Sequence, residues 1–256
     1  MLLRRVVEHV NAQNWFAVGI DFVIVVVGVF IGIQVANWND AVAKQSVAER
    51  MQAGVLVDIG NEKKLVQGMR EYWETTQAYA ETAVIGFSGD PSIDDERFVV
   101  SAYQASQAIY PLSNRATYEQ MVASGNISIS GSDTLRLAIV SFYVSDWSQS
   151  PDNITVAPYR SNIRRAIPHV IQAAIRERCG DEVVPLGVIS GLRLPKTCDI
   201  DVPADIVAET AANLRQRPDL LMDLRHQLSH LSAKLQNMDQ LDLQIDQILE
   251  LAGGGE

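Results

Sequence analysis

Residues 15–38 form an apolar stretch that limits the possible folds more than any other feature of the sequence. The stretch reads WFAVGIDFVIVVVGVFIGIQVANW, and Asp21 is its one charged residue. About 21 helical residues span the roughly 30 Å hydrocarbon core of a bilayer. Trp15 and Trp38 bracket the stretch, and indole rings favour the membrane–water interface. We therefore predict one transmembrane helix over residues 15–38, with these two tryptophans as interface anchors.

A cleaved signal peptide is the main alternative for this segment. Ala41-Val42-Ala43 fits the small-residue pattern of a cleavage site. The apolar stretch is, however, longer than the roughly 7–15 residues of a signal core, and bulky polar residues separate it from the alanines. A buried helix of a soluble protein is a second alternative, but the segment is apolar on all sides. The sequence favours a retained anchor.

The basic residues around the span bear on its orientation. Two arginines, Arg4 and Arg5, precede it, and Lys44 and Arg50 follow it closely, so the flanking charges balance. The preceding segment is short and easily retained in the cytoplasm, whereas a large acidic part follows. We predict that residues 1–14 are a cytoplasmic tail at a bacterial inner membrane and that the larger part is periplasmic.

The charge of the chain excludes some partners. The net charge is −10, and residues 1–38 hold equal numbers of acidic and basic residues, so the excess acid lies beyond the span. Nucleic acid would be repelled by such a domain. No nucleic-acid partner is therefore expected, and the membrane is a partner because of the apolar span, not because of the charge.

Residues 39–217 are predicted to form a mainly α-helical periplasmic domain. Cys179 and Cys198 bound a segment, 179–203, that is rich in proline and glycine; we expect it to be irregular, with room for a short hairpin. In an oxidising compartment the two cysteines can form a disulfide, which would stabilise the fold by about 3 kcal/mol. Hydrophobic periodicity predicts helices over residues 40–87, 94–109 and 135–147 and, with proline kinks, 153–178.

Residues 218–252 carry the clearest helical pattern and are predicted to form a C-terminal amphipathic, coiled-coil-like helix. The helix begins at Pro218, and residues 253–256 are expected to be a flexible tail. Its seam can pack in the core of its own domain or pair with another chain, and the pattern leaves both open. The predicted seam holds Leu221, Leu224, Leu228, Leu231, Leu235 and Met238, fails at Asp242, and resumes in a shifted frame with Leu241, Ile245 and Ile248.

Asp21 is the strongest candidate for a functional residue, because a carboxylate inside a span is costly. At 100° per residue, Asp21 shares one helix face with Val25, Gly28 and Gly32, and small residues let a second helix approach closely. Three interpretations remain open. The carboxyl group can fix an assembly of helices, it can be a proton site in an ion-coupled complex, or it can reach water near the interface.

The remaining candidate residues have ordinary structural explanations. His226 and His230 have metal-ligand spacing, but they lie away from the predicted seam and Gln227 replaces the residue that a zinc-protease motif needs, so we expect a solvated face. Arg160, Arg164 and Arg165 can form an anion site or can pair with the abundant acids. We find no catalytic, metal or cofactor signature, so the sequence does not indicate an enzyme.

Two passages resemble an uncharacterised bacterial family of single-pass membrane proteins. One is residues 21–40, DFVIVVVGVFIGIQVANWND; the other is residues 115–130, RATYEQMVASGNISIS, followed by LRLAIVSFY at 135–143. The family shares an early acidic residue in the span, a glycine-rich middle and a Gln-x-x-Asn-Trp-Asn exit. The chain departs from it in having Asp21 in place of glutamate and in its cysteine-bounded segment. The resemblance implies the topology and a helical domain but no activity.

Taken together, these features predict a membrane-anchored interaction or scaffold protein that assembles as a homo-oligomer or with a polytopic membrane partner. An accessory subunit of an ion-coupled complex, using Asp21, is the first alternative. A small-ligand binding module in the outer domain is the second, and it requires a closed apolar pocket with a few convergent polar groups.

Overall fold

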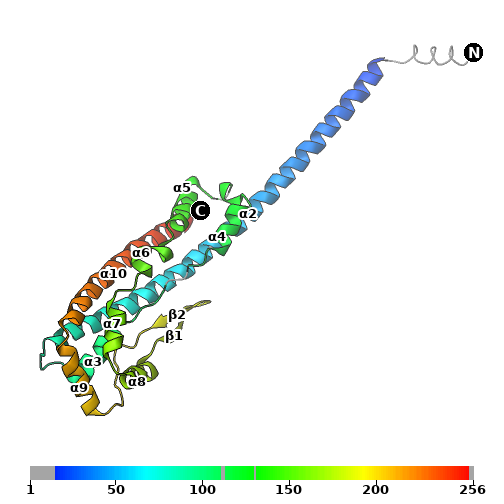
Figure 1. Cartoon of the computed structure of the whole chain (residues 1–256). Helices are drawn as coiled ribbons and strands as arrows, with labels where there is room; N and C mark the ends of the chain where they lie inside the picture. Colours follow the sequence, from blue (N-terminus) through cyan, green and yellow to red (C-terminus); the bar gives the residue numbers. More distant parts are fainter. Residues whose placement is uncertain (1–14, 111–112, 130, 254–256) are drawn as a thin grey trace, which may run out of the picture.

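One very long helix organises the molecule. The computed structural model describes residues 15–110, 113–129 and 131–253, and it is mainly helical. Helix α2 (Trp15–Phe87) contains 73 residues and runs from the apolar segment into the folded part without interruption, as Figure 1 shows. The sequence contains no proline between residues 15 and 87, so nothing removes a backbone hydrogen bond along this length. The predicted tail, residues 1–14, and the side chain of Trp15 lie outside the described part.

The second long helix, α10 (Pro218–Gly253), packs antiparallel along the C-terminal half of α2 (Figure 1). Two ion pairs flank their contact: Lys63 with Asp246, and Arg70 with Asp239 at 2.5 Å. The two pairs are seven residues apart on each helix and run in opposite chain directions, from Lys63 to Arg70 on α2 and from Asp246 to Asp239 on α10. This heptad step is the repeat of a left-handed helix pair, and it fixes the register of the two helices.

The buried residues of both helices alternate in steps of three and four. On α10 these residues are Leu220, Leu224, Gln227, Leu231, Lys234, Met238, Leu241, Ile245 and Ile248. On α2 the matching series is Val55, Ile59, Glu62, Val66, Met69, Trp73, Thr76, Ala80, Ala83 and Phe87. The seam that the sequence predicts for α10 is wrong at three of its leucines. Leu221, Leu228 and Leu235 are only half-buried beside it, and the frame does not shift at Asp242.

The C-terminal helix therefore packs within its own chain, one of the two arrangements that its pattern left open. It also extends through Gly253, the first residue of the predicted flexible tail, whereas residues 254–256 lie outside the described part.

Shorter helices cover the α2–α10 pair. Helix α3 follows α2 after a turn with Gly89 at φ +75° and begins at an N-cap, Asp94, whose side chain accepts from the backbone N–H of Arg97. It ends at Gln104, five residues before the predicted end. The elements in chain order are α3 (Asp95–Gln104), α4 (Ala116–Ala123), η1 (Asn126–Ser128), α5 (Asp133–Ser145), η2 (Trp147–Gln149), α6 (Pro151–Ile154), α7 (Tyr159–Ala166), α8 (His169–Cys179) and α9 (Ala204–Arg215).

Prolines divide the single helix that the sequence predicts over residues 153–178. Pro158 and Pro168 are the N-caps of α7 and α8, so the segment consists of α6, α7 and α8. Segment 179–203, predicted to be irregular, contains the short hairpin that its composition allowed. Strands β1 (Glu182–Pro185) and β2 (Ser190–Arg193) pair antiparallel, and Gly187 in the turn between them has φ +86°.

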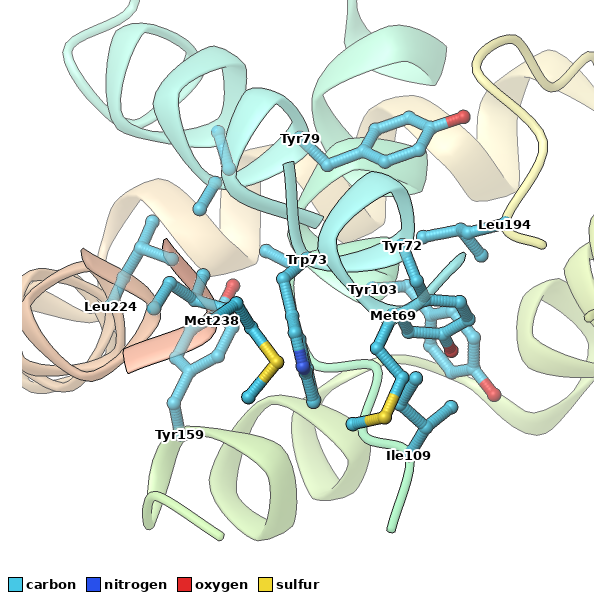
Figure 2. Close-up of a cluster of buried hydrophobic side chains, with 14 of the residues drawn as sticks. Met69, Tyr72, Trp73, Tyr79, Tyr103, Ile109, Tyr159, Leu194, Leu224 and Met238 are labelled. Carbon is cyan, nitrogen blue, oxygen red and sulfur yellow. The ribbon is translucent and has the colours of Figure 1, made fainter. Parts of the chain in front are cut away.

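The core is aromatic where α2, α3, α7 and α10 meet (Figure 2). Trp73 lies between Met69 and Met238, and its ring meets Tyr72 edge-on with centroids 5.5 Å apart. Tyr159, fully buried, donates its hydroxyl to the carbonyl of Ala102 at 2.8 Å. The prediction of one mainly helical chain with a long apolar N-terminal helix is thereby confirmed.

Candidate functional site

The first candidate site is the apolar part of α2. From Gly19 onward the helix is long and apolar enough to cross a membrane, with a mean hydropathy of 2.4 in its most apolar window and none of that window buried. All residues from 19 to 45 are exposed, and Ala48 is the first buried position along the described chain. About ten residues, or about 15 Å of helix, therefore separate Trp38 from the bundle.

The predicted interface residues share an open face of this helix. Asp21, Val25, Gly28 and Gly32 are all exposed, and a Cβ added to either glycine would meet nothing within 4 Å. Gly19, on the opposite face, is equally open. In a single chain this face contacts nothing among the described residues, so any function of it requires a second helix or lipid.

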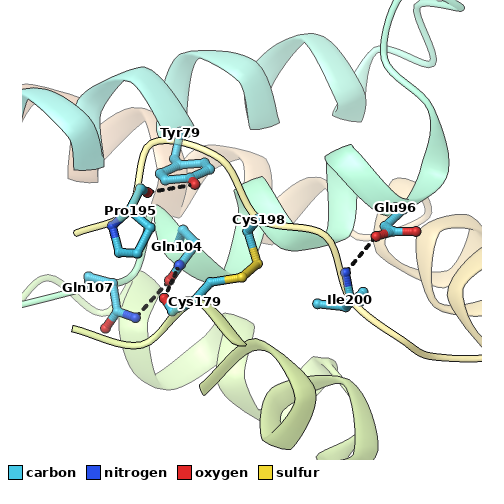
Figure 3. The surroundings of a disulfide bond; sticks show 8 residues. All are labelled: Tyr79, Glu96, Gln104, Gln107, Cys179, Pro195, Cys198 and Ile200. Carbon is cyan, nitrogen blue, oxygen red and sulfur yellow. Dashed lines mark hydrogen bonds between the residues drawn. A yellow bond between two sulfur atoms is a disulfide. The ribbon is translucent and has the colours of Figure 1, made fainter. Parts of the chain in front are cut away.

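The second candidate site is built around the Cys179–Cys198 disulfide, beside α2 and α3 (Figure 3). Cys179, the last residue of α8, and Cys198 lie at disulfide distance, with Cα atoms 5.6 Å apart. Residues 194–202, here called the strap, run from β2 toward α9 across the side of α2 and α3. The predicted cysteine pair therefore ties this strap to helix α8.

Hydrogen bonds hold the strap at both of its ends (Figure 3). The hydroxyl of Tyr79 on α2 donates to the carbonyl of Pro195 at 2.8 Å, and burial raises the pKa of this hydroxyl to about 12. The carboxylate of Glu96 on α3 accepts from the backbone N–H of Ile200 at 2.8 Å. Gln104 supports the disulfide by donating to the carbonyl of Cys179 at 2.9 Å. The strap is thus fixed to three helices.

A groove of about 1280 Å³ lies between the strap and helices α2, α3 and α9. Tyr79, Val100 and Val207 give it an apolar floor, and charged side chains surround them. The acidic lining residues outnumber the basic ones; they are Glu71, Glu74, Asp94, Asp95, Glu96 and Asp199, against Arg97 and Lys196. Sequence reasoning did not predict this groove, because its walls come from segments as far apart in the chain as Glu71 and Ala208.

Some of the acids in the groove have structural tasks and others do not. Asp95 pairs with Arg215 at 2.8 Å, and Asp94 and Glu96 bind backbone N–H groups. In the part of the chain that the structure describes, no ion pair involves the remaining three acids: Glu71, Glu74 and Asp199. Glu71 and Glu74 therefore leave the α2 wall negatively charged, whereas on the strap Asp199 is accompanied by Lys196.

Two ionisable groups are buried in the helix seam. Glu62 accepts a hydrogen bond from the indole N–H of Trp147 at 3.0 Å, and burial is the main cause that raises the pKa of its carboxyl group. Lys234 is 5% exposed; its ammonium group lies 4.6 Å from the centre of the Trp73 ring and donates to the carbonyl of Asn153 at 3.2 Å. Both groups have partners, and both occupy positions that a helix pattern assigns to apolar residues.

Arginines gather at the junction of α3, α7 and α8. The guanidinium of Arg164 bonds Ser106 and Gln107 and lies 4.6 Å from the centre of the Tyr103 ring. Burial, with Arg160 and Arg176 nearby, lowers its pKa. The pairing with acids that the sequence allowed for Arg160 and Arg164 is not found within ion-pair distance in the described chain. Their partners are neutral oxygens, which makes this cluster part of the packing between helices.

The two histidines of α10 lie together on the outside of the bundle. The Nε2 atoms of His226 and His230 are 3.2 Å apart, and His226 is exposed. Among the described residues there is no group of three histidine, cysteine or acidic side chains with metal-binding geometry.

The chain was also compared with known proteins. Its sequence matches no protein-family model, and neither curated proteins nor solved structures give a match to it.

Proposed function

We propose that this protein is a membrane-anchored periplasmic interaction or scaffold protein that assembles through its transmembrane helix. The observation that carries the proposal is the form of α2. One helix contains the exposed apolar segment, with Asp21 and two glycines on one face, and continues without a break into a bundle that begins about 15 Å beyond Trp38. Such a helix would couple assembly in the membrane directly to the position of the outer domain.

The compartment is part of the same proposal. We take the segment before the span as cytoplasmic and the bundle as periplasmic, at a bacterial inner membrane. A disulfide between Cys179 and Cys198 persists only in an oxidising compartment, which supports this orientation. The acidic character of the chain agrees with a part that is translocated rather than retained by basic residues.

Substitution of the glycines tests assembly. Gly28→Leu with Gly32→Leu should convert the oligomer in mild detergent to smaller species, weakening association by about tenfold or more, because bulky side chains keep helices apart. In a single chain both sites have free space, so folding should be unchanged. Gly19→Leu is the matched control, since Gly19 is equally open but faces the opposite side. Chemical crosslinking and native mass measurement would report the oligomer, and an unchanged oligomer in the double variant would refute the proposal.

An accessory role in an ion-coupled complex is the first alternative. Here Asp21 is a proton site and a polytopic partner is required. Asp21→Asn would then abolish the function of the complex while leaving its assembly intact, whereas loss of assembly in the same variant would support the interaction proposal. Purification of the full-length protein under mild detergent, with identification of what accompanies it, separates the two.

A small-ligand binding module in the outer domain is the second alternative, and the groove is the candidate site for it. The groove differs from the closed apolar pocket that a small-molecule site requires, because it is open and lined by charged residues. A role for the outer domain therefore depends on what kind of ligand fits such a surface.

A further inference from the structure

The size and the charge of the groove beside the strap restrict which ligands can bind in it. Its volume of about 1280 Å³ exceeds the roughly 300–1,000 Å³ of sites for small molecules. A longer ligand that lies along the groove would fill it better than a compact one. We propose that the groove binds an extended, basic peptide segment of a partner protein.

Charge complementarity identifies the ligand as basic. Glu71 and Glu74 lie one helical turn apart on α2, and Asp199 lies on the strap across the groove. These three carboxylates have no ion pair within the described chain, although basic residues pair with acids elsewhere on the same bundle. Six acidic residues line the groove against two basic ones, Arg97 and Lys196, so lysine or arginine side chains of a bound segment would match its net charge.

Backbone and hydroxyl groups in the groove fit a peptide in particular. Between the fixed ends of the strap, residues 196–199 make no backbone hydrogen bond to any other described residue. Ser101 lines the same groove; it is 1% exposed, and no described residue bonds its hydroxyl. Free main-chain donors and acceptors beside an apolar floor are what an extended peptide uses for affinity, with side-chain contacts adding specificity.

The position of the groove excludes the lipids of the anchoring membrane as its ligand. Glu71 lies 33 residues beyond Trp38 on one continuous helix, which corresponds to about 50 Å along its axis. The apolar floor and the exposed carboxylates are therefore presented far from the bilayer, where a partner protein can reach them. The inference goes beyond the proposed assembly in the membrane and does not depend on it.

Peptide binding to the full-length protein in phosphatidylcholine nanodiscs tests the inference. The probe is a fluorescent ten-residue peptide of alternating lysine and alanine, and the comparison peptide has glutamate in place of lysine. Fluorescence anisotropy should show saturable binding of the lysine peptide, weaker at high salt, and no binding of the glutamate peptide. Equal binding of both peptides, or of neither, would overturn the inference.

Variants locate the binding site. Glu71→Gln with Glu74→Gln, and separately Asp199→Asn, should raise the Kd of the lysine peptide roughly three- to tenfold, as expected for loss of exposed charge pairs. The control is Glu177→Gln with Glu250→Gln, which removes the same charge from exposed positions outside the groove. Circular dichroism would establish that all variants fold. An equal effect of the control and groove pairs would show binding by net charge alone and refute the groove.

Two competing occupants give distinct results. If spermine binds as tightly as the peptide and with the same dependence on Glu71 and Glu74, the ligand is a small polycation and the peptide proposal is wrong. If the groove variants abolish self-association of the protein, the occupant is a second copy of the chain, which also overturns it. Displacement of the lysine peptide only by other basic peptides of similar length supports it.

Discussion

Glu62 is the residue whose protonation should matter most for stability. Its carboxyl group is buried, and its pKa is raised above the ordinary value of 4.5, with desolvation as the first cause and the nearby carboxylate of Asp58 adding to it. A raised pKa in the folded state means that the folded protein binds a proton more readily than the unfolded chain. The resulting stabilisation is complete below pH 4.5 and is lost as the pH rises through the folded-state value.

Glu62→Gln isolates this effect, because the amide keeps an oxygen that can accept from the indole of Trp147. The free energy of unfolding of the native protein, minus that of the variant, should fall as the pH rises from about 4.5 to 7. Urea denaturation at several pH values would measure the difference. A difference that is constant over this range, or that rises with pH, would contradict the prediction.

Buried polar residues show why the sequence alone misplaced the seam of α10. A helix pattern assigns buried positions to apolar residues, and this placed Leu221, Leu228 and Leu235 in the predicted seam. The structure instead buries Gln227, which donates to the carbonyl of Ala105 at 3.2 Å, and Lys234, which donates to a carbonyl of α6. Their partners come from chain segments more than 70 residues away, and nothing in the local sequence of α10 identifies those partners.

At the scale of the elements, two adjacent leucines near the start of α10 distinguish the observed packing of this helix from the packing predicted from the sequence. Leu220 is fully buried, whereas Leu221 is half-buried and belongs to the frame predicted from the sequence. Leu220→Ala should lower the free energy of unfolding by about 2–5 kcal/mol, since a buried cavity is left, and Leu221→Ala should cost clearly less. Equal costs, or a larger cost for Leu221→Ala, measured by chemical denaturation, would show that the helix packs in the other frame.

Helix ends were predicted best where backbone chemistry determines them. The predicted end of α2 at Phe87 is confirmed, with Gly89 at a positive φ in the turn that follows, whereas Pro158 and Pro168, predicted as kinks, are the N-caps of separate helices because proline lacks an N–H. The sequence also identified Cys179 and Cys198 as a pair. It did not reveal the groove that the strap completes, because Glu71, Arg97 and Asp199 converge only through tertiary packing.

The whole molecule consists of an exposed apolar helix and a bundle that buries its own core. This organisation was predictable from composition, because an unbroken apolar segment near one end contrasts with an amphipathic remainder. The bundle's register was not, since the ion pairs Lys63–Asp246 and Arg70–Asp239 join residues far apart in the chain. The apolar segment and the bundle share α2. The apolar segment takes no part in the packing of the bundle, since no side chain from residue 19 to 45 is buried.

A shortened protein that comprises residues 40–256 should therefore fold on its own. It retains every described buried residue, from Ala48 to Ile248, so its thermal midpoint should match that of the full chain to within about 3 °C, the shift expected from about 1 kcal/mol. If assembly occurs through the span, the shortened protein should also be monomeric where the full chain is oligomeric. Calorimetry and native mass measurement of both proteins test these two points separately. An unfolded shortened protein would mean that the apolar helix supports the bundle, and a folded oligomer would move the assembly interface from the membrane to the outer domain.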